Sequence, residues 1–147
     1  SFDLETIATA VTAAETGHLV YSTLHTIGAA NTIDRVLDVF PPSQQGQVRA
    51  QLADVLSCVV SQQLLPKVGG GRVAAVEVMV ASAAIRNHIR EGKIHQIATA
   101  MQIGKKVGMV TMDDAIYSLY MQGSIEADVA IEYAQDPISL EPKIRGF

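Results

Sequence analysis

The stretch VVSQQLLPKVGGGRVAAVEVMV, residues 59–80, decides the fold class of this protein. It contains two valine-bearing stretches, 59–65 and 72–80, with three consecutive glycines at 69–71 between them. Branched side chains favour strands, and glycine accepts the positive φ angles that a tight turn requires. The stretch therefore predicts a β-hairpin.

The residues before the hairpin alternate between helical and extended patterns. Asp3 is placed to cap a helix with apolar residues at helical spacing, and Gly17 ends that helix. Residues 18–25, HLVYSTLH, are rich in β-formers and predict a strand. Two more helices are expected next, one that stops before Pro41 and one that starts at Ser43. This part of the chain therefore has an α/β pattern.

The residues after the hairpin have a helical pattern almost to the end of the chain. Ser82, Thr111 and Ser124 are suited to cap helices there. Pro137 is expected to terminate the last of these helices, because proline disfavours a helical residue before it. Residues 138–147 are expected to be irregular.

These patterns divide the chain into an α/β part, residues 1–80, and a helical part, residues 81–147. One strand and one hairpin make a poor sheet, because unpaired strand edges need neighbours. We therefore expect the first part to belong to a larger α/β sheet. Ser1 stands almost directly before a predicted helix, which indicates a fragment or a processed chain.

Composition limits the classes of function. The 147 residues are 48% hydrophobic and 18% charged, which is typical of one globular domain. The net charge of −4 argues against nonspecific binding of nucleic acid. The single cysteine, Cys58, excludes a disulfide framework, and its apolar context predicts a small core residue. Glu77 interrupts the richest apolar stretch, so no membrane span is expected, and no signal peptide is recognisable. These features predict a soluble, cytoplasmic domain.

Common catalytic motifs are absent from the sequence. The chain has no G-x-x-x-x-G-K-[ST] loop to hold phosphates and no G-x-S-x-G nucleophile motif. His18 and His25 lie seven residues apart, so a straight strand would separate them by about 23 Å. No spacing of histidine or cysteine favours a metal site.

Two polar clusters stand out as candidate functional groups. The segment STLHT, residues 22–26, places hydroxyls and an imidazole where a strand is expected to end, and ligands of open α/β sheets bind beyond such ends. A polar strand end with a satisfied histidine is the alternative. Arg86 and Arg90 lie four residues apart and share one face of a predicted helix. A solvated basic stripe is the alternative there.

Several segments in order resemble the type II/IV secretion ATPase superfamily, and within it the retraction ATPases of type IV pili. The segments are LETI at 4–7, TAAETGHLV at 12–20, STLHT at 22–26, TIDR at 32–35, DVFP at 38–41, VSQQLLP at 60–66, AIRNHIRE at 84–91 and GMVTMD at 108–113. The resemblance extends over about residues 3–137. It implies the C-terminal part of a RecA-like P-loop ATPase core, followed by a small helical bundle.

The resemblance also implies an activity and its partners. It implies a homo-hexameric, cytoplasmic motor, peripheral to the inner membrane, in which ATP hydrolysis powers pilus retraction and twitching motility. ATP and Mg²⁺ are implied for the full-length protein, and neither is expected to bind this fragment alone. The implied partner is the inner-membrane platform machinery of the pilus, with no nucleic acid and no transmembrane segment.

Individual residues receive roles by the same resemblance. His18 and His25 match the two histidines of the family's His box, which senses the γ-phosphate of the nucleotide, and are the implied catalytic residues. Thr23, Thr26 and Asp3 are implied near the phosphates. The residues implied in subunit contacts or coupling are Arg35, Arg86, Asn87, Arg90 and Glu91. Ile27, Gly28 and His88 depart from the family pattern.

Two alternatives remain open at this point. A pilus assembly or secretion ATPase of the same superfamily shares this core, although the motif at 84–91 and the single cysteine favour the retraction class. A non-catalytic helical adaptor would account for the missing phosphate-binding loop. It would not account for the hydroxyls and the imidazole at 22–26.

Overall fold

The computed structural model describes residues 3–146, so the expectation about Ser1 lies outside the described residues. The elements before the hairpin are α1 (Leu4–Glu15), α2 (Ala29–Asp38) and α3 (Pro42–Val55). The hairpin consists of β1 (Cys58–Pro66) and β2 (Arg72–Val80). The elements that follow are α4 (Ala83–Arg90), the 3-10 turn η1 (Ile94–Gln96), α5 (Ile97–Ile103), a second 3-10 turn η2 (Gly104–Val107), α6 (Met112–Met121), α7 (Ala127–Tyr133) and α8 (Pro137–Arg145). None of the helices in the described part of the chain is long and apolar enough to span a membrane.

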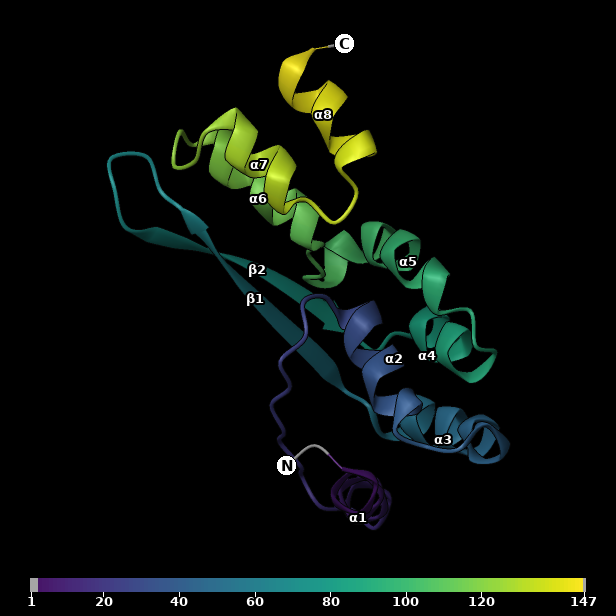
Figure 1. Cartoon of the computed structure of the whole chain (residues 1–147). Helices are drawn as coiled ribbons and strands as arrows, with labels where there is room; N and C mark the ends of the chain where they lie inside the picture. Colours follow the sequence, from purple (N-terminus) through teal and green to yellow (C-terminus); the bar gives the residue numbers. More distant parts are fainter. Residues whose placement is uncertain (1–2, 147) are drawn as a thin grey trace.

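The hairpin is long and twisted, and helices pack along it (Figure 1). Helices α6–α8 lie toward its turn, and α2–α4 lie at its open end (Figure 1). Its strands pair antiparallel from Cys58 with Val80 to Pro66 with Arg72, which confirms the predicted hairpin. The glycines at 69–71 have φ angles of +82°, +107° and +75°, the backbone region that a Cβ atom disfavours. Val110 adds one bridge to β2, because it exchanges both backbone hydrogen bonds with Val78 at 2.9 and 3.0 Å.

The core consists of two clusters that meet along β2. Successive side chains of a strand point to opposite faces, and the buried face of β2 carries Ala75, Glu77 and Met79. The first cluster contains Met79 with buried residues of α1–α5, among them Ile33, Leu52, Ile85, Ile97 and Met101. The second contains Ala75 and Leu65 with Met112, Ile116, Ile125, Ala130 and Leu140. Helices α4 and α5 therefore share a core with the helices that precede the hairpin.

Three predicted helix caps are confirmed. The Thr6 N–H donates to the Asp3 carboxylate (2.8 Å), the Ile85 N–H to the Ser82 hydroxyl (3.3 Å), and the Asp114 N–H to the Thr111 hydroxyl (3.2 Å). Each side chain satisfies a backbone donor that the first turn of a helix leaves free. Ser124 is not a cap, because α7 begins after Glu126.

The predicted strand at 18–25 was wrong. The backbone there is extended and links α1 to α2 (Figure 1), but within residues 3–146 the sheet consists of β1 and β2 alone. The side chains of Leu19 and Tyr21 are 80% and 87% exposed. The β-forming residues produce an extended segment, whereas a strand also needs a neighbour with which to exchange hydrogen bonds.

Two further expectations were wrong. Residues 137–145 form α8 instead of an irregular tail, because Asp136 caps this helix and Pro137 occupies its first position, where proline loses no hydrogen bond. The Asp136 carboxylate accepts from the Ser139 N–H at 3.2 Å and from the Ser139 hydroxyl at 2.6 Å. Cys58 is exposed at the start of β1 and is not a core residue.

Acid is expected to loosen the first turn of α8. The side-chain and backbone hydrogen bonds from Ser139 lower the pKa of Asp136 below its usual value. A carboxylate with a lowered pKa in the folded state contributes stability above its unfolded pKa, about 3.9, and this is lost as the pH falls through the folded pKa. The protection factor of the Ser139 amide, measured by NMR, should therefore fall in acid. Asp136→Asn keeps a capping side chain and should remove this pH dependence. Protection that stays constant through the same pH range would contradict the prediction.

Candidate functional site

A pocket of about 360 Å³ lies between α1, the segment 22–26 and α2. Its polar lining includes Thr23, His25 and Thr26 from the segment and Arg35 from α2. The remaining lining residues are Thr6, Ile7, Ala10, Ser22 and Leu24. The structure thus brings together four of the residues that the sequence singled out.

The turn between His25 and α2 is held by hydrogen bonds within residues 26–32. Thr32 uses its hydroxyl proton toward the Gly28 carbonyl at 2.8 Å. The contact of 2.7 Å between the Thr26 and Thr32 hydroxyls must then use the proton of Thr26. Gly28 has a φ of +92°, which suits glycine at this entry to the helix. Thr26 therefore holds the turn, and its proton is not free for a ligand.

The donors that remain in this pocket suit an anion. Thr23 and His25 are exposed, and both can donate hydrogen bonds, while Arg35 adds a permanent positive charge. Burial, with a smaller effect from the charge of Asp38, raises the pKa of the neighbouring Asp34. The lining itself contains no carboxylate. A phosphate-like group fits this set of side chains better than a cation does.

His18 and Asp3 do not line this pocket. His18 lies just beyond the end of α1, where its Nδ1 is 3.3 Å from the Thr16 hydroxyl and 3.2 Å from the Ala13 carbonyl. Asp3 caps the start of the same helix. The two histidines of the candidate His box are therefore separate in this structure, and only His25 lines the pocket.

The arginines of α4 hold the end of α3. The Nη1 of Arg86 donates to the carbonyls of Ala53 (2.5 Å) and Asp54 (3.1 Å), and Arg90 forms an ion pair of 2.9 Å with the Asp54 carboxylate. The last carbonyls of a helix have no partner within it and carry a partial negative charge, so a guanidinium is favourable there. Arg86 is thus engaged with α3 rather than solvated.

The other two residues of this motif stay near the surface of α4. Asn87 is exposed, and its backbone carbonyl accepts from the Glu91 N–H at 3.0 Å. The Glu91 carboxylate pairs with Lys93 at 3.0 Å. Neither contact reaches the pocket at His25.

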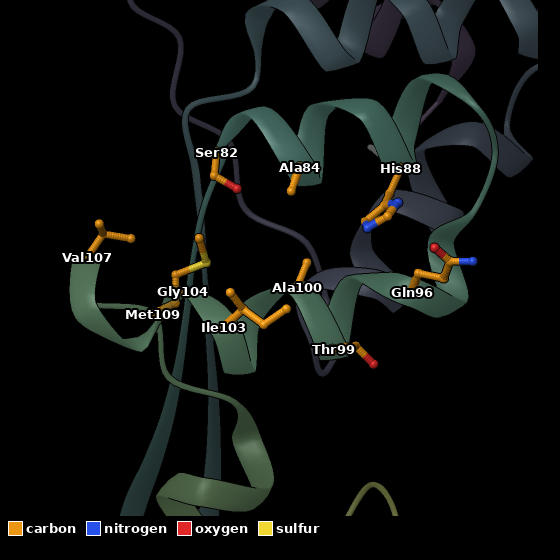
Figure 2. Close-up of a pocket in the computed structure, with 10 residues that line it drawn as sticks. All are labelled: Ser82, Ala84, His88, Gln96, Thr99, Ala100, Ile103, Gly104, Val107 and Met109. Atoms are coloured by element: carbon orange, nitrogen blue, oxygen red, sulfur yellow. The ribbon is translucent and has the colours of Figure 1, made fainter.

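A larger pocket of about 510 Å³ lies on another side of α4, between this helix, α5 and η2. Figure 2 shows Ala84 and His88 of α4 facing α5, with Gln96 beside His88 and with Ile103, Val107 and Met109 toward the other end. Its lining is mostly apolar and contributes one titratable side chain, His88. This pocket is less suited to a phosphate than the pocket at His25.

Sequence reasoning missed two carboxylates that bind backbone N–H groups at the starts of helices. Glu77 is buried and accepts hydrogen bonds from the backbone of α2 and α6, and Asp113 accepts from the residues before α8. The available signal was the presence of Glu77 inside the richest apolar stretch. A charge in such a place requires partners.

The sequence and the fold both match known proteins. Residues 2–70 match the family model described as type II/IV secretion system protein. The chain is 53% identical over 135 residues to the type IV pilus retractation ATPase PilT of Pseudomonas aeruginosa, covering 92% of this chain and 39% of that protein. It is 50% identical over 139 residues to the twitching motility protein of Neisseria gonorrhoeae, covering 94% of this chain and 37% of that one.

A solved structure of the pilus retraction motor PilT with bound ADP superposes with a TM-score of 0.84 at 50% identity, covering 95% of this chain and 39% of that one. The α/β fold with a helical region, expected from the RecA-like ATPases, is confirmed by this match. The chain spans less than two fifths of the length of these relatives. Residues 2–70 thus resemble the type II/IV secretion system family, and over its aligned length the chain is homologous to part of the PilT-type pilus retraction proteins.

Proposed function

We propose that this chain supplies the phosphate-sensing and coupling elements of a motor ATPase that drives retraction of type IV pili in twitching motility. The carrying observation is the pocket in which Thr23, His25 and Arg35 lie together, in a chain 53% identical over 135 residues to a retraction ATPase. A retraction ATPase is favoured over an assembly ATPase by the resemblance of the motif at residues 84–91.

The proposed substrate is ATP, whose phosphoryl bond supplies the free energy of the motor. His25 and Thr23 would donate hydrogen bonds to phosphate oxygens, and Arg35 would add charge either in its own subunit or at a neighbour. Thr26 would keep the turn in place. His18 and Asp3 would support the segment 22–26 indirectly. Asp3 would cap the start of α1, and His18, at the end of the same helix, would anchor the residues that lead to His25.

The remaining parts of the site belong to the complete protein. No three His, Cys, Asp or Glu side chains gather into a possible metal site within residues 3–146. The Mg²⁺ that accompanies ATP is proposed for the complete protein, where one or two protein oxygens and the phosphates would hold it. A homo-hexamer at the inner membrane, acting on the pilus platform machinery, is the proposed assembly.

We propose different roles for the two regions of the chain. Residues 1–80 would belong to the ATPase core and carry the His25 pocket, and residues 81–147 would transmit its state. Arg86 and Arg90, with Asn87 of the same helix and Glu91 directly after it, would couple the hydrolysis cycle to pilus movement. Their contacts with the end of α3 support this assignment, because α3 leads directly into the hairpin.

ATP hydrolysis by the complete protein and by the 147-residue chain tests the proposal. The complete protein should hydrolyse ATP, and its reading frame should contain a G-x-x-x-x-G-K-[ST] motif outside these 147 residues. The 147-residue chain, shown to be folded by circular dichroism, should give no turnover. Robust hydrolysis by this chain alone would contradict the proposal, because the 147 residues contain no such phosphate-binding loop.

A further inference from the structure

A buried carboxylate lies between the two core clusters. Glu77 is 7% exposed and stands on β2 between Ala75, which belongs to the second cluster, and Met79, which belongs to the first. Burying a charged group is costly unless hydrogen bonds compensate it. The partners of Glu77 should therefore account for its position.

The two oxygens of Glu77 accept hydrogen bonds from two different helices. Oε1 accepts from the Ala29 N–H at 2.6 Å, and Oε2 accepts from the Met112 N–H at 2.8 Å. Ala29 is the first residue of α2, and Met112 is the first residue of α6. Backbone donors at such positions are free and carry a partial positive charge, so one carboxylate stabilises both helix starts.

On the α2 side, this contact adjoins the turn that follows His25. Gly28 immediately precedes Ala29, and its carbonyl accepts from the Thr32 hydroxyl, which in turn contacts Thr26. A short chain of hydrogen bonds thus connects Glu77 to the residue next to His25. A shift of that turn would displace the donor that Glu77 binds.

On the α6 side, the contact adjoins a second carboxylate. Asp113 follows Met112, and its oxygens accept from the N–H groups of Gln135 at 2.7 Å and Asp136 at 2.9 Å. Asp136 is the cap of α8. The start of α8 is thereby tied to the start of α6, and through Glu77 to the start of α2.

We infer that Glu77 is a positioning residue that couples the His25 pocket to α6 and, through Asp113, to α8. Two acceptor oxygens are required, because each meets a backbone donor. A glutamine would present one oxygen and one NH₂ group, so at one of the two contacts its NH₂ group would face a backbone N–H, which is also a donor. The inference rests on the proposed function only in taking a nucleotide as the ligand that perturbs the His25 segment.

Hydrogen–deuterium exchange of the complete protein, with and without ADP, tests this coupling. In the wild type, ADP should slow exchange in peptides covering 22–32, 111–118 and 134–142. In Glu77→Gln, the response at 22–32 should persist, while the responses at 111–118 and 134–142 are lost. Glu132→Gln, the same change at an exposed position of α7, should retain all three responses. Steady-state kinetics of Glu77→Gln should show kcat about tenfold lower and a KM for ATP within about twofold of wild type.

The outcomes separate the coupling from the proposed function. Two results would overturn the coupling alone. In the first, Glu77→Gln keeps the responses at 111–118 and 134–142. In the second, the wild type responds to ADP at 22–32 but at neither of the other two segments. A wild type without a response at 22–32 would overturn the nucleotide site as well. If Glu77→Gln does not fold, Asp113→Asn serves instead, because it leaves both contacts of Glu77 in place. It should lose only the response at 134–142, and a retained response there would overturn the second link.

Discussion

Replacing His25 by alanine in the complete protein is expected to lower the turnover of ATP by about 100-fold. His25 lines the pocket at the start of α2 beside Thr23 and Arg35. Its side chain is exposed, so its removal takes little packing away from the core. Hydrogen-bond donors placed at charge that develops in the transition state lower the barrier, and their loss lowers kcat more than it weakens substrate binding.

The measurement is steady-state ATP hydrolysis, with circular dichroism and thermal unfolding as tests of folding. His95→Ala is the matched control, because His95 is also exposed but lies on η1, away from the pocket. The control should keep wild-type turnover. Unchanged hydrolysis by His25→Ala would remove this residue from the mechanism. An equal loss in both variants would point to a general effect of removing surface imidazoles.

Local signals in the sequence were sufficient for much of the fold. The hairpin was predictable because its turn and its strands are encoded by neighbouring residues. Residues 18–25 were misjudged because pairing depends on a second strand, which β-propensity does not report. The helix at 137–145 was missed because an Asp-Pro pair can end one helix or begin another. The burial of Leu140 against the second cluster favours the latter.

The candidate site was predictable only in part, because contacts between residues that are distant in the sequence leave no local signal. The hydroxyls and the imidazole of STLHT are adjacent in sequence, so the cluster was visible. Glu77 binds backbone groups 48 and 35 residues away, and Arg86 binds a carbonyl 33 residues away. No periodicity or spacing reports such partners. Their roles emerge once the fold brings the ends of helices together.

Replacing Arg86 by alanine should largely abolish pilus retraction while leaving the His25 pocket intact. Nη1 of Arg86 donates to the carbonyls of Ala53 and Asp54, and its loss leaves the last turn of α3 without these partners. A hydrogen bond from a charged group is worth about 1.5–3 kcal/mol, and the bond to Asp54 is exposed, so the free energy of unfolding should fall by about the value of one such bond. Twitching of cells that carry the variant, and ATP turnover of the purified protein, are the measurements.

The comparison that decides the role of Arg86 is between retraction and hydrolysis at a temperature well below unfolding. A coupling residue should lose retraction while most of the turnover remains, whereas a residue needed only for stability should lose neither at that temperature. Arg72→Ala is the matched control, because Arg72 is exposed at the start of β2. Arg86→Lys keeps the charge and several N–H donors, but its Nζ ends one bond nearer the backbone than Nη1, so an intermediate loss is expected. Unaltered retraction in Arg86→Ala would exclude Arg86 from coupling. The coupling of ATP hydrolysis to retraction would then not depend on the contacts between Arg86 and the end of α3.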